Sequence, residues 1–205
     1  MDDHVVISAV RHGITAYNKR KAYMGWSNPP LLEEALAKIT PYEKEDVLVV
    51  GSDLKRCEET AKALFPKAPY YSFKEWRELH FGQWEGKTYH ELKDNVQYRK
   101  WVDHPFTREI PGGEMYTDFK ERINQALLYS LNELKKSRKT KLVIVTHGGV
   151  IRSLHERFLK ENNVFWNLNI GYTEAITWKM TYERVRRDES CISYSEGLLT
   201  ENVSG

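Results

Sequence analysis

Cysteines and long apolar runs are both scarce in this sequence. Its 205 residues include only two cysteines, Cys57 and Cys191, which cannot supply a disulfide framework for a domain of this size. No segment approaches the roughly 18 consecutive apolar residues of a transmembrane helix, and no basic segment precedes the short apolar run near the N-terminus. From these absences we expect a cytoplasmic protein that does not enter a membrane.

A large charge of one sign is missing as well. The 31 lysines and arginines nearly balance the 29 aspartates and glutamates, so the formal net charge is +2. Proteins that bind nucleic acids usually show a larger and clustered positive excess. The basic runs at 19–21, 135–139 and 184–187 are interpreted as solvated helix ends or turns, because acidic residues surround them. We therefore expect no nucleic-acid partner, and the sequence leaves the oligomeric state open.

Several common catalytic motifs are absent. There is no Walker A or Gly-x-Gly-x-x-Gly sequence, so no nucleotide cofactor is indicated. A Cys-x5-Arg loop that began at Cys57 would need arginine where Ala63 stands, and no Asp-x-Asp pair is present for an aspartyl-phosphate enzyme. No His-Glu-x-x-His sequence and no histidine pair with zinc spacing occurs. We expect no cofactor and no metal ligand.

Three short β-branched runs, at 5–10, 47–50 and 142–145, are the clearest strand signals. Uninterrupted apolar runs of this length are typical of strands buried on both faces of a parallel sheet. Apolar residues with helical spacing follow the second run, at 54–64, and Ser52 or Asp53 is a possible cap of this helix. Two further helical patterns, at 115–134 and 150–158, lie before and after the third run. This alternation of strands and helices predicts an α/β fold.

The rest of the chain carries weaker signals. With about 150 residues per domain as a guide, the length allows one domain. Segment 66–114 holds four of the seven prolines and many aromatic residues, so we interpret it as short helices and loops inserted in the α/β frame. Segments 175–180 and 184–195 predict a β-hairpin or meander. We expect a single domain at 1–197 and a polar tail at 198–205.

Cationic and imidazole side chains follow the three predicted strands. Arg11 and His12 come directly after the first, Arg56 lies one turn inside the helix after the second, and His147 follows the third. Ligands of open parallel sheets bind beyond the carboxyl ends of the strands. Guanidinium groups bind phosphate oxygens, a neutral imidazole can attack phosphorus, and helix N-termini add N–H donors. The sequence therefore predicts a phosphoryl site, and Gly148 would let the backbone approach the anion.

Five motifs in order resemble those of the histidine phosphatase superfamily, also called phosphoglycerate mutase-like. The resemblance covers roughly residues 5–180 and is strongest for its small phosphatase branch, which includes broad-specificity phosphatases and α-ribazole phosphatases. It implies a three-layer α/β/α fold with a mostly parallel sheet, in which the insertion lies over the active site. The motifs are Arg11-His12-Gly13-x-Thr15-x-x-Asn18, Ser52-Asp53-Leu54-x-Arg56-x-x-x-Thr60-Ala61, Glu78 to Gly86, Pro111-Gly112-Gly113-Glu114 and Val145 to Arg152.

The resemblance also implies roles for individual residues. His12 would attack phosphorus and form a phosphohistidine, while Arg11, Arg56 and His147 would hold the phosphoryl oxygens. Glu78 would protonate the leaving oxygen and then activate water. Further substrate contacts would come from Asn18, from Gly148 and, because Met24 cannot donate a hydrogen bond, from the backbone of Gly25. The implied activity is hydrolysis of a small phosphorylated metabolite without a metal ion.

Three alternatives remain open from the sequence. Glu85 competes with Glu78 as the acid, although a carboxylate bonded to nearby backbone is the simpler interpretation of Glu85; Glu114 is interpreted as a helix-start carboxylate. A phosphoglycerate mutase would normally have paired arginines in a longer insertion, whereas the arginines of segment 66–114 are isolated. A non-catalytic binding module on this fold would usually lack the nucleophile or an arginine. The physiological substrate is not identified by the sequence.

Overall fold

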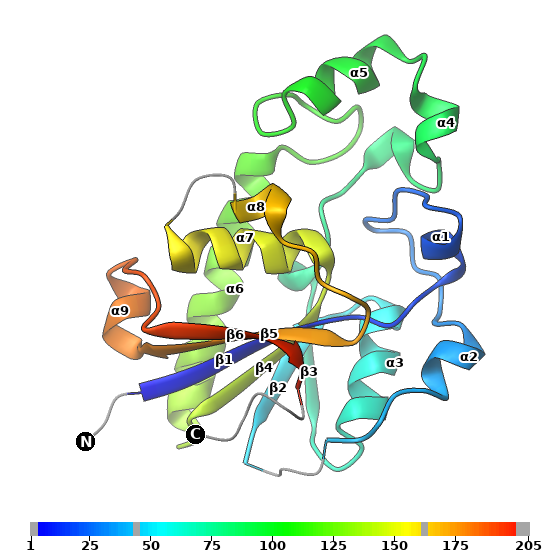
Figure 1. The fold of residues 1–205 in the computed structure, drawn as a ribbon. Helices are drawn as coiled ribbons and strands as arrows, with labels where there is room; N and C mark the ends of the chain where they lie inside the picture. The colour runs from blue at the N-terminus through cyan, green and yellow to red at the C-terminus, as the bar shows by residue number, and fades with distance from the viewer. Residues whose placement is uncertain (1–3, 43–45, 161–163, 200–205) are drawn as a thin grey trace.

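One mixed β-sheet organises the computed structural model, which describes residues 4–42, 46–160 and 164–199 (Figure 1). In the described part, its six strands have the order β3-β2-β4-β1-β5-β6. The first four in this order are parallel to one another, and β5 is antiparallel to both of its neighbours, β1 and β6. This confirms the predicted α/β fold with a mostly parallel sheet. The strands are β1 (His4–Arg11), β2 (Leu48–Ser52), β3 (Tyr70–Phe73), β4 (Lys141–Thr146), β5 (Glu174–Thr181) and β6 (Ser193–Leu198).

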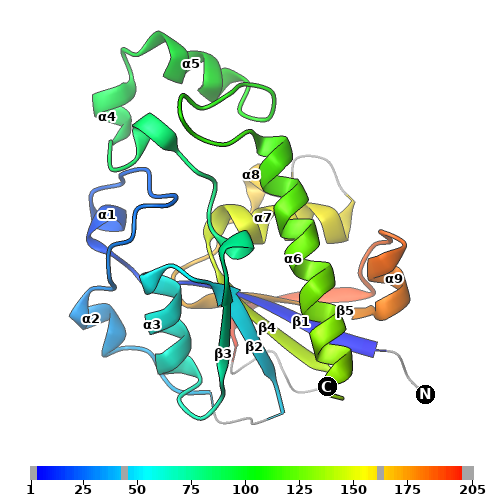
Figure 2. The ribbon, with the colours of Figure 1, turned by 180° about the vertical axis from the view of Figure 1, so that it is seen from behind.

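Helices cover both faces of this sheet and complete three layers. Alternate residues of β4 point to opposite faces, so Leu142 and Ile144 join one core cluster while Val143 and Val145 join the other. The first cluster contains the apolar residues of α6 (Tyr116–Lys136) and α7 (Gly148–Leu159), and the second those of α3 (Lys55–Leu64). In the rear view, α6 runs across the near face of the sheet (Figure 2). These helices are the ones that apolar spacing predicts.

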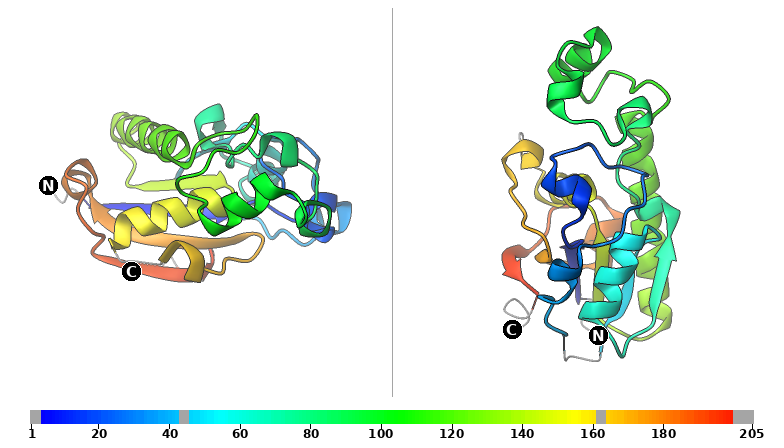
Figure 3. Two further views of the ribbon diagram at one scale, coloured as in Figure 1. Left: turned by 90° about the horizontal axis from the view of Figure 1, so that it is seen from above. Right: turned by 90° about the vertical axis from the view of Figure 1, so that its right-hand side faces the viewer.

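The inserted segment after β3 projects away from the sheet (Figure 3). It contains η1 (Lys74–Trp76), η2 (Gly82–Trp84), α4 (Tyr89–Leu92) and α5 (Val96–Asp103). Trp84, Tyr98 and Trp101 pack together inside it, with ring centroids 5.3 to 6.3 Å apart. Further short helices are α1 (Ala16–Lys19), α2 (Glu33–Leu36), α8 (Val164–Asn167) and α9 (Tyr182–Arg186). No helix in the described ranges is both long and apolar enough to cross a membrane.

Four local expectations need correction. Segment 66–114 was expected to hold only helices and loops, but it begins with the edge strand β3. Residues 184–186 belong to α9 (Tyr182–Arg186) rather than to a hairpin arm, although β5 and β6 do pair. Neither Ser52 nor Asp53 is the N-cap of α3, which is Leu54. The sheet also extends one residue past 197, Leu199 is buried, and residues 200–205 lie outside the described part.

Candidate active site

The two histidines lie next to each other at the carboxyl ends of neighbouring strands. β1 ends at Arg11 and β4 at Thr146, and these two residues are partners in the parallel register. The N–H of His12 donates to the carbonyl of Thr146 at 2.9 Å, and the His12 and His147 ring centroids are 5.2 Å apart. Both side chains are almost completely buried. Sheet topology thus brings together two side chains that are 135 positions apart in the sequence (147 − 12).

The His12 ring is held with one nitrogen ready to attack. Its Nδ1 lies 2.6 Å from the carbonyl oxygen of Gly13, which can only accept, so the proton resides on Nδ1 and Nε2 keeps its lone pair. Burial lowers the pKa of His12 well below its ordinary value, and the positive charges of Arg56 and Arg11 lower it further against the Gly13 bond. The imidazole is therefore neutral at pH 7, as nucleophilic attack requires.

Two guanidiniums, buried Arg56 and half-buried Arg11, face this imidazole, and each has an unused donor. Arg56, fully buried on α3, donates from Nη1 and Nη2 to the carbonyls of Ser27 and Gly25 at 2.8 Å. Arg11 donates from Nη1 to the carbonyl of Ile170 at 2.7 Å and lies 4.1 Å over the ring of Tyr172. The Nε atoms of both arginines are buried and have no partner among the described residues. Buried cationic donors without acceptors are rare, and here they indicate an anion site.

His147 lies beside the guanidiniums at the N-terminus of α7, where it is the N-cap residue. Burial lowers its pKa well below the ordinary value, followed by the charges of Arg56 and His12. Its ring nitrogens lie 3.6 and 3.9 Å from the sulfur of Cys57. Burial raises the pKa of the Cys57 thiol to about 12, so this sulfur remains protonated and is not a thiolate nucleophile. The backbone of Gly148 follows at the first turn of α7.

Glu78 is held against the same helix end. Its Oε2 accepts from the N–H of Gly149 at 2.8 Å, and its Oε1 accepts from the N–H of Leu79 at 2.9 Å. A Cβ at position 149 would lie only 2.2 Å from Glu78 Oε1, so the close approach requires glycine. Arg152, one turn along α7, lines the same cavity as Glu78. Burial lowers the pKa of Arg152, and the charge of Glu78 partly offsets this.

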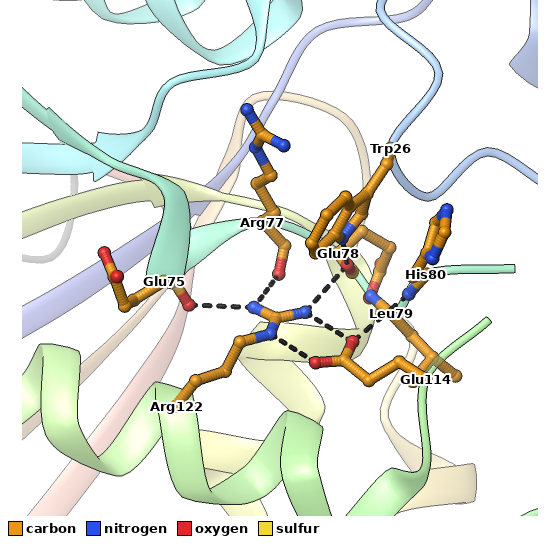
Figure 4. Close-up of polar contacts among 8 residues, drawn as sticks. All are labelled: Trp26, Glu75, Arg77, Glu78, Leu79, His80, Glu114 and Arg122. Atoms are coloured by element: carbon orange, nitrogen blue, oxygen red, sulfur yellow. Dashed lines mark hydrogen bonds and ion pairs between the residues drawn. The ribbon is translucent and has the colours of Figure 1, made fainter. Parts of the chain in front are cut away.

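An arginine from α6 holds the loop that carries Glu78 (Figure 4). Arg122 donates to the backbone carbonyls of Glu75, Arg77 and Glu78 at 2.6 to 2.9 Å. It also pairs bidentately with Glu114 at 2.6 and 2.8 Å, and Glu114 accepts from the N–H of His80 at 3.2 Å. We call Arg122 and Glu114 the loop clamp. Glu114 is thus bonded to α6 and to the loop, consistent with its interpretation as a structural carboxylate near the helix start.

Glu85 is a carboxylate bonded to nearby backbone, which is the simpler of the two interpretations that the sequence allows. Its carboxylate accepts from the N–H groups of Gly25, Trp26, Ser27 and Phe81 and from the Ser27 hydroxyl, at 2.6 to 3.1 Å. Burial raises the pKa of Glu85, but these hydrogen bonds outweigh it and the net shift is downward. A carboxylate stabilised in its ionised form is a poor proton donor. The geometry therefore favours Glu78 over Glu85 as the acid.

Asn18 and Gly25, the two remaining predicted substrate contacts, differ in whether a donor group is left for a substrate. Asn18 accepts from the N–H and hydroxyl of Thr15 at 3.0 Å, which leaves its amide N–H group without a partner in the described part of the chain. The predicted substrate contact from the Gly25 backbone is not supported. The N–H of Gly25 donates to Glu85 and its carbonyl accepts from Arg56, so Gly25 positions Arg56 instead.

Three residues at the site were not predicted from the sequence. Arg152 lies one helical turn after Gly148, so helix periodicity could have placed it beside the phosphoryl site. Arg122 belongs to the regular apolar and polar pattern of α6, in which nothing distinguishes it from a solvated helix arginine. Tyr172 comes from the loop before β5, and it reaches Arg11 because β5 pairs with β1. No local sequence pattern shows that these two strands are neighbours.

Comparisons with known proteins agree with this geometry. The family model described as "Histidine phosphatase superfamily (branch 1)" matches residues 7–189. The chain is 32% identical over 167 residues to phosphoglycerate mutase-like protein 4 of Arabidopsis thaliana, covering 76% of this chain and 71% of that protein. It is 29% identical over 175 residues to a metal-independent phosphoserine phosphatase of Arabidopsis thaliana, covering 80% and 72%. The crystal structure of the α-ribazole phosphatase from Shigella flexneri aligns with a TM-score of 0.77 at 21% identity, covering 98% and 99%.

Proposed function

The chain belongs to the histidine phosphatase superfamily (branch 1), and from this membership we propose that it hydrolyses a small phosphorylated metabolite with His12 as the nucleophile and without a metal ion. The sequence resemblance to this family is confirmed, and the chain is a phosphatase. The observation that carries the assignment of His12 is its bond to Gly13, which directs Nε2 and its lone pair away from the backbone. The scarcity of cysteine supports a cytoplasmic location, which we also propose.

In the proposed mechanism, His12 Nε2 attacks phosphorus and the bond between phosphorus and the leaving oxygen breaks. The unused Nε donors of Arg11 and Arg56 bind phosphoryl oxygens and stabilise the charge of the transition state. Glu78 gives its proton to the leaving oxygen. It then takes a proton from water, whose oxygen attacks the phosphohistidine and releases inorganic phosphate and neutral His12.

Metal independence is supported by the charge already present in the protein. The guanidiniums of Arg11 and Arg56 and the helix N-terminus that begins after His147 supply the electrostatic stabilisation that a cation provides in other phosphatases. A relative named a metal-independent phosphoserine phosphatase supports the same conclusion. The non-catalytic alternative gains no support, because the nucleophile, both arginines and the acid lie in one site. A mutase reaction through a phosphohistidine would use the same groups, so product analysis separates it from hydrolysis.

A panel of phosphomonoesters assayed in EDTA tests this proposal. We expect full activity in EDTA and loss of nearly all activity in His12→Ala, because the proposed mechanism forms its bond to phosphorus at Nε2 of His12, which the Gly13 contact leaves free. His90→Ala, which replaces an exposed histidine on α4, is the matched control and should keep its activity. Activity that requires an added metal ion, or that survives His12→Ala, would refute the mechanism. Efficient isomerisation of 3-phosphoglycerate with 2,3-bisphosphoglycerate would indicate a mutase instead.

A further inference from the structure

A cavity of about 680 Å³ opens beside Glu78, beneath the inserted segment. Its volume lies within the usual range of roughly 300 to 1,000 Å³ for small-molecule sites. One end reaches Glu78, Gly149 and Arg152, which places it where the leaving group of a bound phosphomonoester would extend. The other lining residues are Tyr23, Leu79, Phe81, Tyr89, Tyr98, Trp101, Val102, Pro105, Phe106, Tyr116, Phe119 and Phe165.

The wall of this cavity is mainly aromatic and apolar. The hydroxyls of Tyr23 and Tyr98 bond to each other at 2.8 Å, and the hydroxyl of Tyr116 donates to Glu156. Tyr23 packs against Phe81 and Trp101 with ring centroids 4.8 and 6.1 Å apart. Since these hydroxyls already have partners, the cavity offers an added ligand mainly apolar and aromatic surface.

Charged side chains occur only at the phosphoryl end of the cavity. Among its described lining residues, Glu78 and Arg152 alone are charged. Arg152 donates from Nε to the carbonyl of Leu168. Its Nη1 and the Nε of Arg11 would both lie within 3.7 Å of a Cβ built on Gly148, so Arg152 adds to the positive charge around the phosphoryl group. An ammonium or carboxylate deeper in the cavity would lose its hydration without gaining a counter-charge.

We propose that this cavity binds the leaving group and selects uncharged, ring-bearing or bulky apolar alcohols. The preferred substrates are then phosphomonoesters of such alcohols rather than phosphorylated amino acids or hydroxy acids. This inference rests on the proposed function, because it assigns the leaving group to the cavity that contains the acid Glu78. The apolar walls reject a charged leaving group by desolvation, and a ring gains by being removed from water.

Three substrates with aliphatic leaving oxygens test this inference: 2-phenylethyl phosphate, ethyl phosphate and phosphoserine. We expect kcat/KM for 2-phenylethyl phosphate to exceed both others by at least about tenfold, the size of discrimination that an apolar pocket provides. Equal or higher values for phosphoserine or ethyl phosphate would overturn the inference and leave the proposed function standing. Hydrolysis of none of a broad set of phosphomonoesters would refute the proposed function itself.

A pair of variants on α5 locates the selectivity in the cavity. Val102 and Val96 are both exposed valines of this helix, but only Val102 lines the cavity. We expect Val102→Glu to lower kcat/KM for 2-phenylethyl phosphate by about tenfold, with a clearly smaller loss for ethyl phosphate, because the new carboxylate borders the ring. Val96→Glu should change neither value. Equal effects of the two substitutions, or equal losses for both substrates in Val102→Glu, would contradict a leaving-group site at this wall.

Discussion

At the residue scale, each reacting side chain is oriented by backbone groups close to it. Gly13 accepts from Nδ1 of His12, which leaves Nε2 for attack. The N–H groups of Leu79 and Gly149 fix the carboxyl of Glu78 at the start of α7. The second arrangement depends on the missing side chain at position 149, so Glu78, the proposed acid, and Gly149 form one structural unit.

Replacing Glu78 with glutamine tests the proton donor. The amide keeps the size of the side chain but cannot give a proton, so kcat/KM should fall in proportion to how basic the leaving oxygen is. We expect a loss of about 100-fold or more for an alkyl phosphate and a much smaller loss for p-nitrophenyl phosphate. Steady-state kinetics on both substrates measure this. Equal losses would assign the acid elsewhere.

Replacing Gly149 with alanine tests whether the acid depends on its close approach to α7. The new methyl group would overlap with the Glu78 carboxylate and displace it. We expect Gly149→Ala to reproduce the leaving-group dependence of Glu78→Gln. The effects should not add, because residues in direct contact couple strongly. In a double-mutant cycle, Gly149→Ala should cost little when Glu78→Gln is already present; full additivity would mean that the glycine acts independently.

Strand ends made the reacting residues predictable, whereas their partners were not. His12, His147 and Arg56 follow strands whose apolar runs are plain in the sequence, so their convergence follows from the parallel sheet. The bonds of Gly25 to Glu85 and Arg56 join segments 31 to 60 residues apart. No local pattern encodes such contacts, so the sequence does not show that the N–H and the carbonyl of Gly25 already have partners.

At the element scale, the loop clamp connects α6 to the segment that carries the acid. Arg122 makes three of its bonds to backbone carbonyls of residues 75–78, so it holds the path of the chain rather than any one side chain (Figure 4). Its fork of five N–H donors fits this task, and lysine, with a single ammonium, does not. A loop displaced by about 1 Å is enough to cost a large factor in rate.

Arg122→Lys should therefore impair catalysis through the acid. We expect kcat/KM for an alkyl phosphate to fall by on the order of 10- to 100-fold, with a smaller loss for p-nitrophenyl phosphate. Arg157→Lys is the matched control, because Arg157 is equally buried and bonds to Asn124, Val185 and Asp188 far from the phosphoryl site. A purely structural role would lower stability in both variants and leave the dependence on the leaving group unchanged.

Elements with strong periodicity were predicted correctly, and short edge elements were missed. α6 and α7 bury regular apolar stripes, and β1, β2 and β4 are continuous β-branched runs. β3 has only four residues, and two of them, Tyr71 and Ser72, are exposed, so it shows no apolar run. α9 begins after its Thr181 cap, between the two segments read as strands, and its last residues belong to the second of them. In both places tertiary contacts decide the structure.

At the scale of the whole molecule, the two buried histidines of the phosphoryl site make the free energy of unfolding depend on pH. His12 and His147 are buried beside two guanidiniums, and burial lowers the pKa of each well below the ordinary value of about 6.5. The unfolded chain binds protons at both positions below about pH 6.5, and the folded protein does not. The free energy of unfolding therefore falls as the pH drops below this value, and it is unaffected by these groups above it.

Urea unfolding at about pH 7 and about pH 5.5, in buffer without phosphate, measures this effect. Two histidines whose pKa burial lowers should together cost the wild type up to about 2.5 kcal/mol of stability between these values, the limit for rings that stay fully neutral when folded. The double variant with His12→Gln and His147→Gln should lack this loss, whatever its stability at pH 7. His155, whose pKa burial also lowers, is present in both proteins and cancels. The same pH dependence in both would show that these histidines titrate normally.

Trapping the phosphorylated protein tests the central claim most directly. The wild type is mixed with a labelled phosphomonoester, quenched within the first turnovers, and its phosphopeptides are mapped by mass spectrometry. The account predicts a phosphoryl group on His12 that is stable in base and lost in acid, and none in His12→Ala. Turnover without any trapped phosphoenzyme under several quench conditions, or a phosphoryl group on another residue, would contradict it.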